Sequence, residues 1–198
     1  VDLINTTPEF EDILKKNSYL QSSFNQQFIV GSLYSFTYNG MVDQNDTHQF
    51  FVNTNLDIAG NLLDLISGNS EEDPQTVFNL EYAQYAKADV DFRYHLNLGG
   101  GKKLATRLFA GYGMPYGNSK IMPFTKQYFS GGPYSVRAFR IRQLGPGTYN
   151  PDNVPEEEDD PGLMNTDYFD RAGNIRLEAN IEYRFPLFPP YVNGAVFA

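Results

Sequence analysis

The chain has 198 residues, of which 41% are hydrophobic, and a formal net charge of −9. No apolar run approaches the ~20 residues that a transmembrane helix requires, which excludes a helical membrane protein but leaves a membrane β-barrel open. The acidic balance argues against nucleic acid as a partner, and the absence of cysteine excludes disulfides and thiolate metal sites.

Alternation of apolar and polar residues predicts six β-strands along the chain. The clearest places Val90, Phe92 and Tyr94 on one face and Asp91, Arg93 and His95 on the other. The same pattern predicts strands over residues 24–38, 50–58, 78–98, 104–116 and 175–185, and from residue 191 to the end. In the five complete predicted strands one face is largely apolar, and the opposite faces carry charges such as Arg176, Glu178, Glu182 and Arg184.

The connections between these strands alternate in length. Residues 39–47, 99–102 and 186–190 form short turns, whereas residues 59–77 are longer, with a helical turn expected at 61–66, and residues 117–172 form a very long loop. Outer-membrane barrels combine short periplasmic turns with long external loops. The sequence therefore predicts an all-β fold, an antiparallel transmembrane β-barrel, with 117–172 as an external loop. A soluble β-sandwich remains the alternative, because it also hides one apolar face.

The aromatic content also favours a barrel. The chain has 14 Tyr and 16 Phe but no Trp, and aromatic girdles mark both membrane interfaces of such barrels. The girdle candidates are Tyr34, Phe36, Tyr38, Tyr94, Tyr112, Tyr116 and Tyr183. Six strands cannot close around a polar lumen, because barrel diameter grows with strand number. We therefore expect residues 1–198 to be part of one barrel domain, with both ends of the chain inside a larger protein.

Catalysis and metal binding have little support. Asp89, Asp91, Arg93 and His95 share a polar face, which alternation alone explains as a lumen network. His48 is expected near a turn, and no nucleophile elbow or His-based metal spacing is present, so we expect no enzyme, cofactor or metal site. The acidic run at 156–160 is expected to be solvated; a calcium site or docking patch is the alternative, although the regular calcium-loop spacing is missing.

Two motifs indicate a family. The long loop contains Phe-Ser-Gly-Gly-Pro-Tyr-Ser-Val-Arg-Ala-Phe-Arg at 129–140, and Gly-Asn-Ile-Arg-Leu-Glu-Ala-Asn-Ile-Glu-Tyr-Arg-Phe-Pro follows at 173–186. Together they resemble the two motifs of the BamA/TamA superfamily of outer-membrane assembly factors. The matching loop positions are Gly131, Gly132, Val136, Arg137, Ala138 and Phe139, and the matching strand positions are Gly173, Asn174, Glu182, Arg184 and Pro186. Ala138 departs from the family, which usually has glycine there.

The resemblance implies strands eight to thirteen of a sixteen-stranded barrel in the bacterial outer membrane, with the loop folded into the lumen. It also implies that Arg137 pairs with Glu182 and so latches the loop. The function implied is insertion or translocation of outer-membrane proteins, without a cofactor. The partners implied are unfolded outer-membrane proteins, the lipid bilayer and accessory envelope subunits. In that family an incoming strand pairs with an exposed edge at a weak seam, which lies outside this chain.

Four rival interpretations remain. A two-partner secretion translocator shares both motifs, and a passive porin would lack the arginine latch. A barrel phospholipase would lose activity when His95 is changed to Ala. A soluble sandwich would leave the membrane without detergent.

Overall fold

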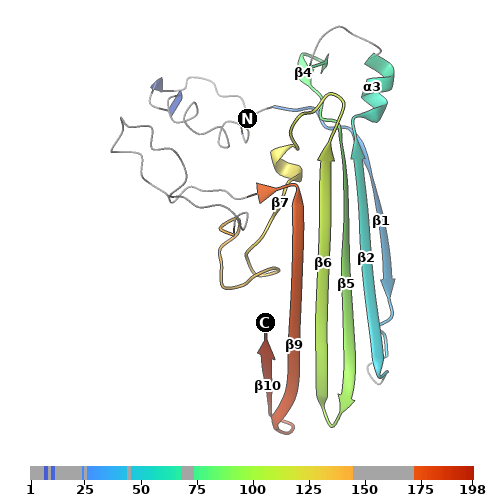
Figure 1. Ribbon diagram of the computed structural model, residues 1–198, viewed down its shortest axis with the longest axis vertical. Helices are drawn as coiled ribbons and strands as arrows, with labels where there is room; N and C mark the ends of the chain where they lie inside the picture. The colour runs from blue at the N-terminus through green and yellow to red at the C-terminus, as the bar shows by residue number, and fades with distance from the viewer. Residues whose placement is uncertain are drawn as a thin grey trace. The chain divides into compact units, whose positions relative to one another are not determined.

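The computed structural model describes residues 7–8, 10–11, 24, 26–43, 46–67, 74–144 and 172–198. Its main element is a six-stranded antiparallel sheet with strand order β1-β2-β5-β6-β9-β10 (Figure 1). The strands are β1 (Gly31–Asn39), β2 (His48–Ala59), β5 (Tyr85–Gly99), β6 (Lys102–Pro115), β9 (Ile175–Phe188) and β10 (Val192–Phe197). This confirms the predicted all-β fold and its antiparallel order.

Short elements occupy the longer connections. Helix α3 (Asn61–Ser67) follows β2, as the predicted helical turn required, and β3 (Thr76–Val77) pairs with β4 (Leu80–Glu81). After β6 come a 3₁₀ helix, η1 (Phe124–Lys126), and β7 (Tyr128–Phe129), which pairs with β8 (Ala172–Gly173). In the described part of the chain, every helix is too short or too polar to cross a membrane.

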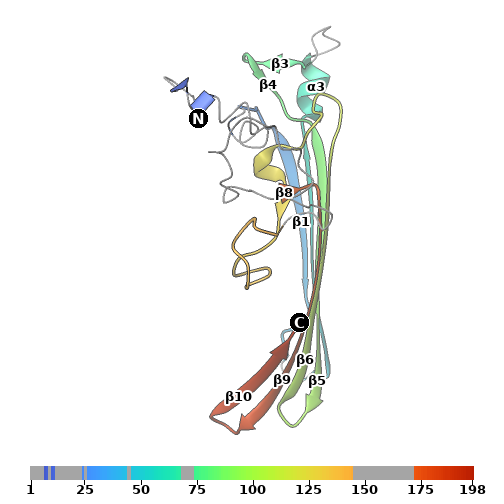
Figure 2. The same ribbon diagram turned by 60° about the vertical axis from the view of Figure 1, so that its left-hand side comes forward.

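The chain forms two compact units. One comprises Val1–Asn25 and Pro123–Gly173, and the other comprises Gln26–Met122 and Asn174–Ala198, including the whole six-stranded sheet. Within the second unit the strands form one curved layer, and β9 and β10 bend strongly at their turn end (Figure 2). A curved, open antiparallel sheet is what part of a barrel wall presents.

The predicted alternation of connection lengths is confirmed. The three shorter connections join β1 to β2, β5 to β6 and β9 to β10 at one end of the sheet, and the longer ones leave the other end (Figure 1). The tightest, between β5 and β6, places Gly99, Gly100 and Gly101 at φ values of 77°, 59° and 77°. Three successive left-handed residues are accessible to glycine at little cost, which explains the glycine run.

The prediction that the first strand begins at residue 24 is wrong. β1 begins at Gly31, opposite Ala59, the last residue of β2. Beyond that pair the neighbouring chain turns into α3, so no strand remains for the preceding residues to join. Phe28 instead forms an isolated parallel bridge with Tyr82.

The prediction that the third strand extends back to residue 78 is also wrong. Phe78 and Asn79 have φ values of 54° and 63° and form the turn between β3 and β4. Just before β5, the backbone of Gln84 is bonded from outside the sheet: its N–H donates to Ser119 Oγ at 2.8 Å and its carbonyl accepts from Tyr116 N at 3.1 Å. The apolar–polar alternation is interrupted at the same place, because Gln84 takes an apolar position and Ala83 and Tyr85 take polar positions of the pattern.

The register fixes which side chains share a face. Tyr34 lies opposite Leu56, Leu56 opposite Ala88, Ala88 opposite Tyr112, and Tyr112 opposite Ile175. Even-numbered residues of β1, β2, β5 and β6 therefore share one face with odd-numbered residues of β9. We call this the apolar face and its opposite the polar face.

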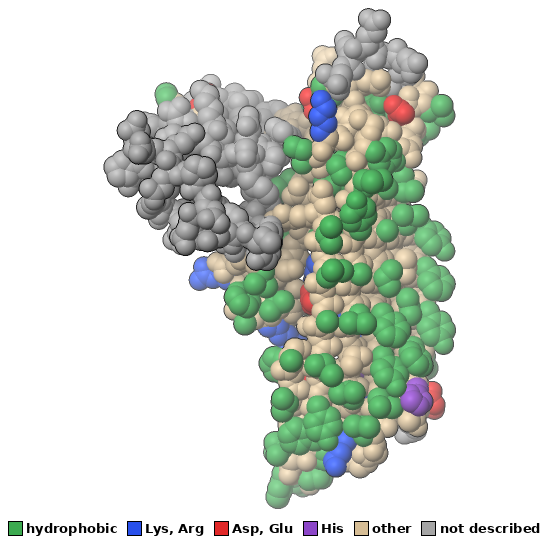
Figure 3. All heavy atoms as spheres, in the orientation of Figure 1, with side chains coloured by type: hydrophobic (Ala, Val, Ile, Leu, Met, Phe, Trp, Pro, Cys, Tyr) green, Lys and Arg blue, Asp and Glu red, His purple; other side chains and the backbone are tan. Residues whose placement is uncertain are grey.

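Large side chains on the apolar face are exposed. Their exposed fractions reach 64% at Tyr34, 55% at Leu108 and 77% at Leu177. Figure 3 shows apolar side chains gathered over the central strands on this side of the sheet. A sandwich would bury such residues against a second sheet. The alternative of a soluble sandwich is therefore not supported, and the fold is a partial β-barrel.

Candidate functional site

The polar face carries a cluster of five charged side chains on three adjacent strands. Asp91 and Arg93 come from β5, Arg107 from β6, and Arg176 and Glu178 from β9. We call these five residues the charge ladder. The carboxylates are its most enclosed members, because the side chain of Asp91 is 12% exposed and that of Glu178 is 6% exposed.

Asp91 holds two arginines that face each other across β5 and β6. Arg93 and Arg107 are direct partners in the register. Arg93 donates Nε and Nη2 to the two Asp91 oxygens at 3.1 and 2.9 Å, and Arg107 donates Nη2 to Oδ2 at 2.9 Å. Facing like charges destabilise a strand pair. The carboxylate between the guanidinium groups offsets that repulsion through charge-assisted hydrogen bonds.

Arg107 also reaches the next strand. Its Nη1 donates to Glu178 Oε1 at 3.2 Å, and Glu178 accepts a second bond from Arg176 Nη2 at 2.5 Å. One guanidinium therefore bridges a carboxylate on β5 and a carboxylate on β9, the strands on either side of its own. Ion pairs therefore join the same three strands that the backbone hydrogen bonds of the sheet join.

The ring of Phe109 lies among these charges. The guanidinium carbon of Arg176 is 4.6 Å from the ring centroid, and that of Arg107 is 5.8 Å away. The Arg176 Nε is buried with no hydrogen-bond partner in the described part of the chain. Attraction between the cation and the ring face compensates part of that loss. The Phe109 ring thus gives the Arg176 guanidinium a favourable contact in addition to its hydrogen bond with Glu178.

The remaining predicted polar-face residues occupy the expected side. His95 lies opposite Gln49 and Ala105, and Ala105 lies opposite Glu182. Asp89 accepts a hydrogen bond from Asn55 Nδ2 at 2.7 Å. The alternation therefore placed Asp89, Asp91, Arg93 and His95 correctly. Within the described ranges, no cluster of three or more potential ligands is arranged to hold a metal ion.

The loop motif folds into a compact turn around its two glycines. Gly131 and Gly132 have φ values of 98° and 90° and are buried. The Gly132 N–H donates to Phe139 O at 2.9 Å, and a Cβ on Gly131 would overlap the carbonyl oxygen of Arg140. Both the backbone conformation and the lack of space therefore require glycine at these positions.

The other loop-motif residues lie along this turn. The carbonyl of Val136 accepts from Phe139 N at 3.1 Å, and the Phe139 side chain is 46% exposed. Ala138 is absent from the described non-glycine residues with positive φ. Alanine in place of the family's usual glycine is thus compatible with this backbone. Arg137 is exposed on the same turn.

The strand motif begins at the end of β8 and covers most of β9. Gly173 pairs with Tyr128 in the short β7–β8 ladder, and the carbonyl of Asn174 accepts from Gly113 N at 2.7 Å. At the other end, Arg184 donates Nε to Glu182 Oε1 at 2.8 Å, and Pro186 lies opposite Asn193 of β10. The motif therefore places Glu182 on the polar face.

The predicted pairing of Arg137 with Glu182 stays a prediction, because it joins the two separate compact units. The acidic run at 156–160 lies outside the described residues. Sequence reasoning did not identify the links from Arg107 to Asp91 and Glu178. The partners lie 16 and 71 residues away in the chain, and no local spacing signals such contacts.

The girdle candidates show a consistent placement. Tyr34, Tyr94, Tyr112 and Tyr183 lie in the phase of the apolar face. On β9, the distance from Ile175, which pairs with Tyr112, to Tyr183 is about 26 Å at ~3.3 Å per residue. That length matches the ~25 Å apolar band of outer-membrane barrels. Tyr116 differs, because its hydroxyl donates to Asn61 Oδ1 at 2.7 Å beyond the end of β6.

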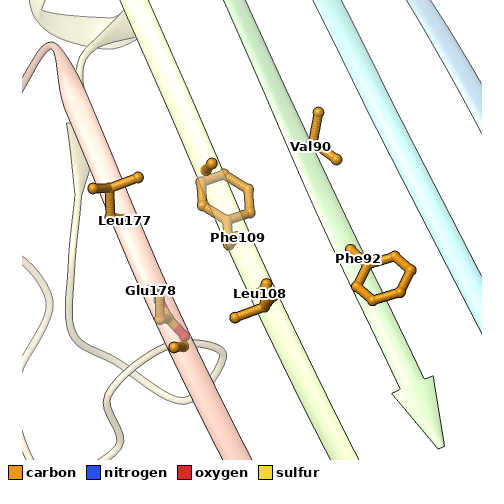
Figure 4. Close-up of a pocket in the computed structure, with 8 residues that line it drawn as sticks. Val90, Phe92, Leu108, Phe109, Leu177 and Glu178 are labelled. Carbon is orange, nitrogen blue, oxygen red and sulfur yellow. The ribbon is translucent and has the colours of Figure 1, made fainter.

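The apolar face also has a shallow groove over β5, β6 and β9. Figure 4 shows Val90 and Phe92 from β5, Leu108 from β6 and Leu177 from β9 around it. Ala110 and Ala179 leave the hollow between these larger side chains. Phe109 and Glu178 also border the groove, but both are in the phase of the polar face. The residues of the apolar face that surround the groove are all uncharged. It is a feature of the apolar face and separate from the charge ladder.

A family model described as the Omp85 superfamily domain matches residues 34–198. No match was found among curated proteins. Members of this superfamily are bacterial outer-membrane β-barrels, generally non-enzymatic, with broad roles in protein insertion or translocation. The matched range includes both sequence motifs and the six-stranded sheet, apart from the first three residues of β1.

Proposed function

The chain belongs to the Omp85 superfamily, and from that premise we propose that it forms the latch-bearing sector of a BamA/TamA-like barrel. The barrel would insert or translocate outer-membrane proteins, with the lipid bilayer around the apolar face. Its substrates would be unfolded outer-membrane proteins, and accessory envelope subunits would assist. Such a role needs no cofactor, because an incoming strand binds by pairing with an exposed edge.

The observation that carries this proposal is the compact turn at residues 129–144. Two buried left-handed glycines shape the turn, and it displays Arg137. Glu182 stands on the polar face of β9, the side that faces the lumen in a barrel. An arginine on a shaped turn and a carboxylate on the lumen wall are the two components of a loop latch. We expect the latch to keep the lumen from being an open pore.

The charge ladder supports assembly rather than passive diffusion. Each of its carboxylates binds two of its guanidinium groups, in the order Arg93, Asp91, Arg107, Glu178, Arg176. Groups committed to such pairs contribute little net field to a passing ion. The same pairs hold β5, β6 and β9 together, so a seam that opens for substrate is expected elsewhere in the barrel.

Depletion of the full-length protein in cells tests the proposed function. A census of folded outer-membrane proteins should show a loss of several barrels, while inner-membrane proteins stay at their usual levels. Unchanged outer-membrane proteins would rule out a general insertase. Loss of a single secreted protein with an intact barrel census would instead identify a two-partner secretion translocator.

Charge exchange tests the latch within the full-length protein. Arg137→Glu alone and Glu182→Arg alone should raise the conductance of the barrel in planar bilayers, because each leaves like charges facing each other. The double variant should restore low conductance. Arg140→Glu, on the same turn, is the matched control and should change conductance little. Additive effects of the two single changes would contradict the latch.

A further inference from the structure

We propose that Arg142 is a positioning residue that clasps the base of the motif turn and so fixes where Arg137 is displayed; this rests on the proposed latch. The guanidinium carbon of Arg142 lies 4.4 Å from the ring centroid of Phe124 and 4.9 Å from that of Phe129. One cation therefore contacts the η1 helix and the β7 strand together.

The backbone of Arg142 closes the same turn. Its N–H donates to Ser130 O at 3.0 Å, and the neighbouring bridge joins Ser130 to Leu144. Arg137 lies on the segment enclosed by these contacts. The ends of the turn are thereby held to each other, and the Arg142 guanidinium links them to η1 by contacting both aromatic rings.

The backbone of Arg142 adopts a conformation that is unfavourable for a residue with a side chain. Its φ is 64°, which places a non-glycine residue in the left-handed region. Such a conformation is unfavourable for a side chain with a Cβ and persists only where surrounding contacts hold it. A glycine or asparagine would satisfy this backbone more easily. Arginine at this position indicates that the contacts of the guanidinium outweigh the conformational cost.

Arginine suits this role better than lysine. A planar guanidinium stacks on aromatic faces, whereas an ammonium is a compact and strongly hydrated charge. The two rings come from segments on the same side of the turn in sequence, Phe124 before β7 and Phe129 within it. The clasp thus connects the segment before the turn, which carries both rings, to the segment after it, which carries Arg142.

The direct test is limited proteolysis of the full-length protein, with cleavage mapped to residues 130–144. Cleavage tracks the population of the open turn when opening is fast. Loss of two cation–π contacts should raise that population by roughly five- to thirtyfold in Arg142→Met. Arg140→Met is the matched control on the same turn and should change cleavage less than twofold. Equal effects of the two changes would overturn the clasp.

A second variant separates the guanidinium from the backbone. Arg142→Gly relieves the left-handed conformation but removes both ring contacts. The clasp predicts faster cleavage than in the parent protein, and Arg142→Lys should fall between the parent and Arg142→Met. Slower cleavage in Arg142→Gly would show that only the backbone conformation matters and would contradict the proposal.

A third measurement tests the positioning role. In the Arg142→Met background, the conductance effects of Arg137→Glu and Glu182→Arg should become additive, because Arg137 is no longer held in one place. Retention of the full charge-exchange rescue would contradict positioning. Absence of rescue in the parent protein would count against the latch instead, while the proteolysis result would still decide whether the clasp exists.

Discussion

The two faces of the six-stranded sheet differ in how their side chains are stabilised. The apolar face leaves Leu108 and Leu177 more than half exposed, which is unfavourable in water and suitable in lipid. The polar face binds its charges to one another, with Asp91 and Glu178 as the carboxylates of the ladder. The comparison shows that alternation alone separates the apolar side chains, which suit lipid, from the polar ones. The charged side chains of the ladder also need specific partners on neighbouring strands.

The largest expected effect comes from placing a charge on the apolar face. Leu108→Arg should lower the free energy of unfolding by about 2–4 kcal/mol, the cost of arginine at mid-depth on a lipid-facing strand. Ser35→Arg is the matched control, because Ser35 lies on the polar face of β1. Urea titration of the full-length protein in lipid vesicles measures both. Equal losses would contradict the assignment of the faces.

Removing the carboxylate between the facing arginines should have the next largest effect. Asp91→Ala should cost about 2 kcal/mol, between the ~0–1 kcal/mol of an exposed ion pair and the ~3–5 kcal/mol of a buried one. The combined Arg93→Met and Asp91→Ala variant should lose less than the sum of the two single changes, because one of the facing cations is gone. Strict additivity in the same titration would show that the ladder is not coupled.

A smaller and local effect is expected in the motif turn. Gly131→Ala should destabilise the turn by about 1–2 kcal/mol from the left-handed backbone alone, and overlap with the Arg140 carbonyl adds to this. Gly173→Ala is the control, since a Cβ there meets open space. Protease cleavage at residues 130–144 reports the difference. Indistinguishable cleavage of the two variants would argue against the described turn.

The smallest effect should come from the short-turn end of the apolar face. Tyr94→Phe removes the 2.8 Å hydrogen bond between its hydroxyl and His48 Nδ1 but keeps the ring that packs against Phe50. A loss of about 0.5–1 kcal/mol is expected. Tyr94→Ala should cost more, because the ring contacts also disappear. A larger loss in Tyr94→Phe than in Tyr94→Ala would contradict this order.

The sequence predicted the faces of the sheet because alternation is a local property. It assigned Val90 and Asp91 to opposite sides, and the glycine runs indicated turns. It failed at residues 24–30 and 78–84, where the end of a strand depends on whether a partner strand continues beside it. It also could not predict the contacts of Arg107, because register between distant strands determines them.

The motif turn shows the same limit. The family resemblance singled out Gly131 and Gly132 as motif positions, and the structure adds that both have left-handed conformations. The stacking of Arg142 on Phe124 and Phe129 could not be predicted, because Phe124 lies in a short 3₁₀ helix without a sequence signal. Side-chain contacts that close a loop depend on the path of the chain both before and after the turn.

Solvent accessibility along β6 tests the central claim most directly. The chain has no cysteine, so spin labels can be placed one at a time at residues 105–110 of the full-length protein in lipid vesicles. Labels at 106, 108 and 110 should relax faster with lipid-soluble oxygen, and labels at 105, 107 and 109 with a water-soluble nickel complex. Accessibility without a period of two, or with the two phases exchanged, would contradict the account.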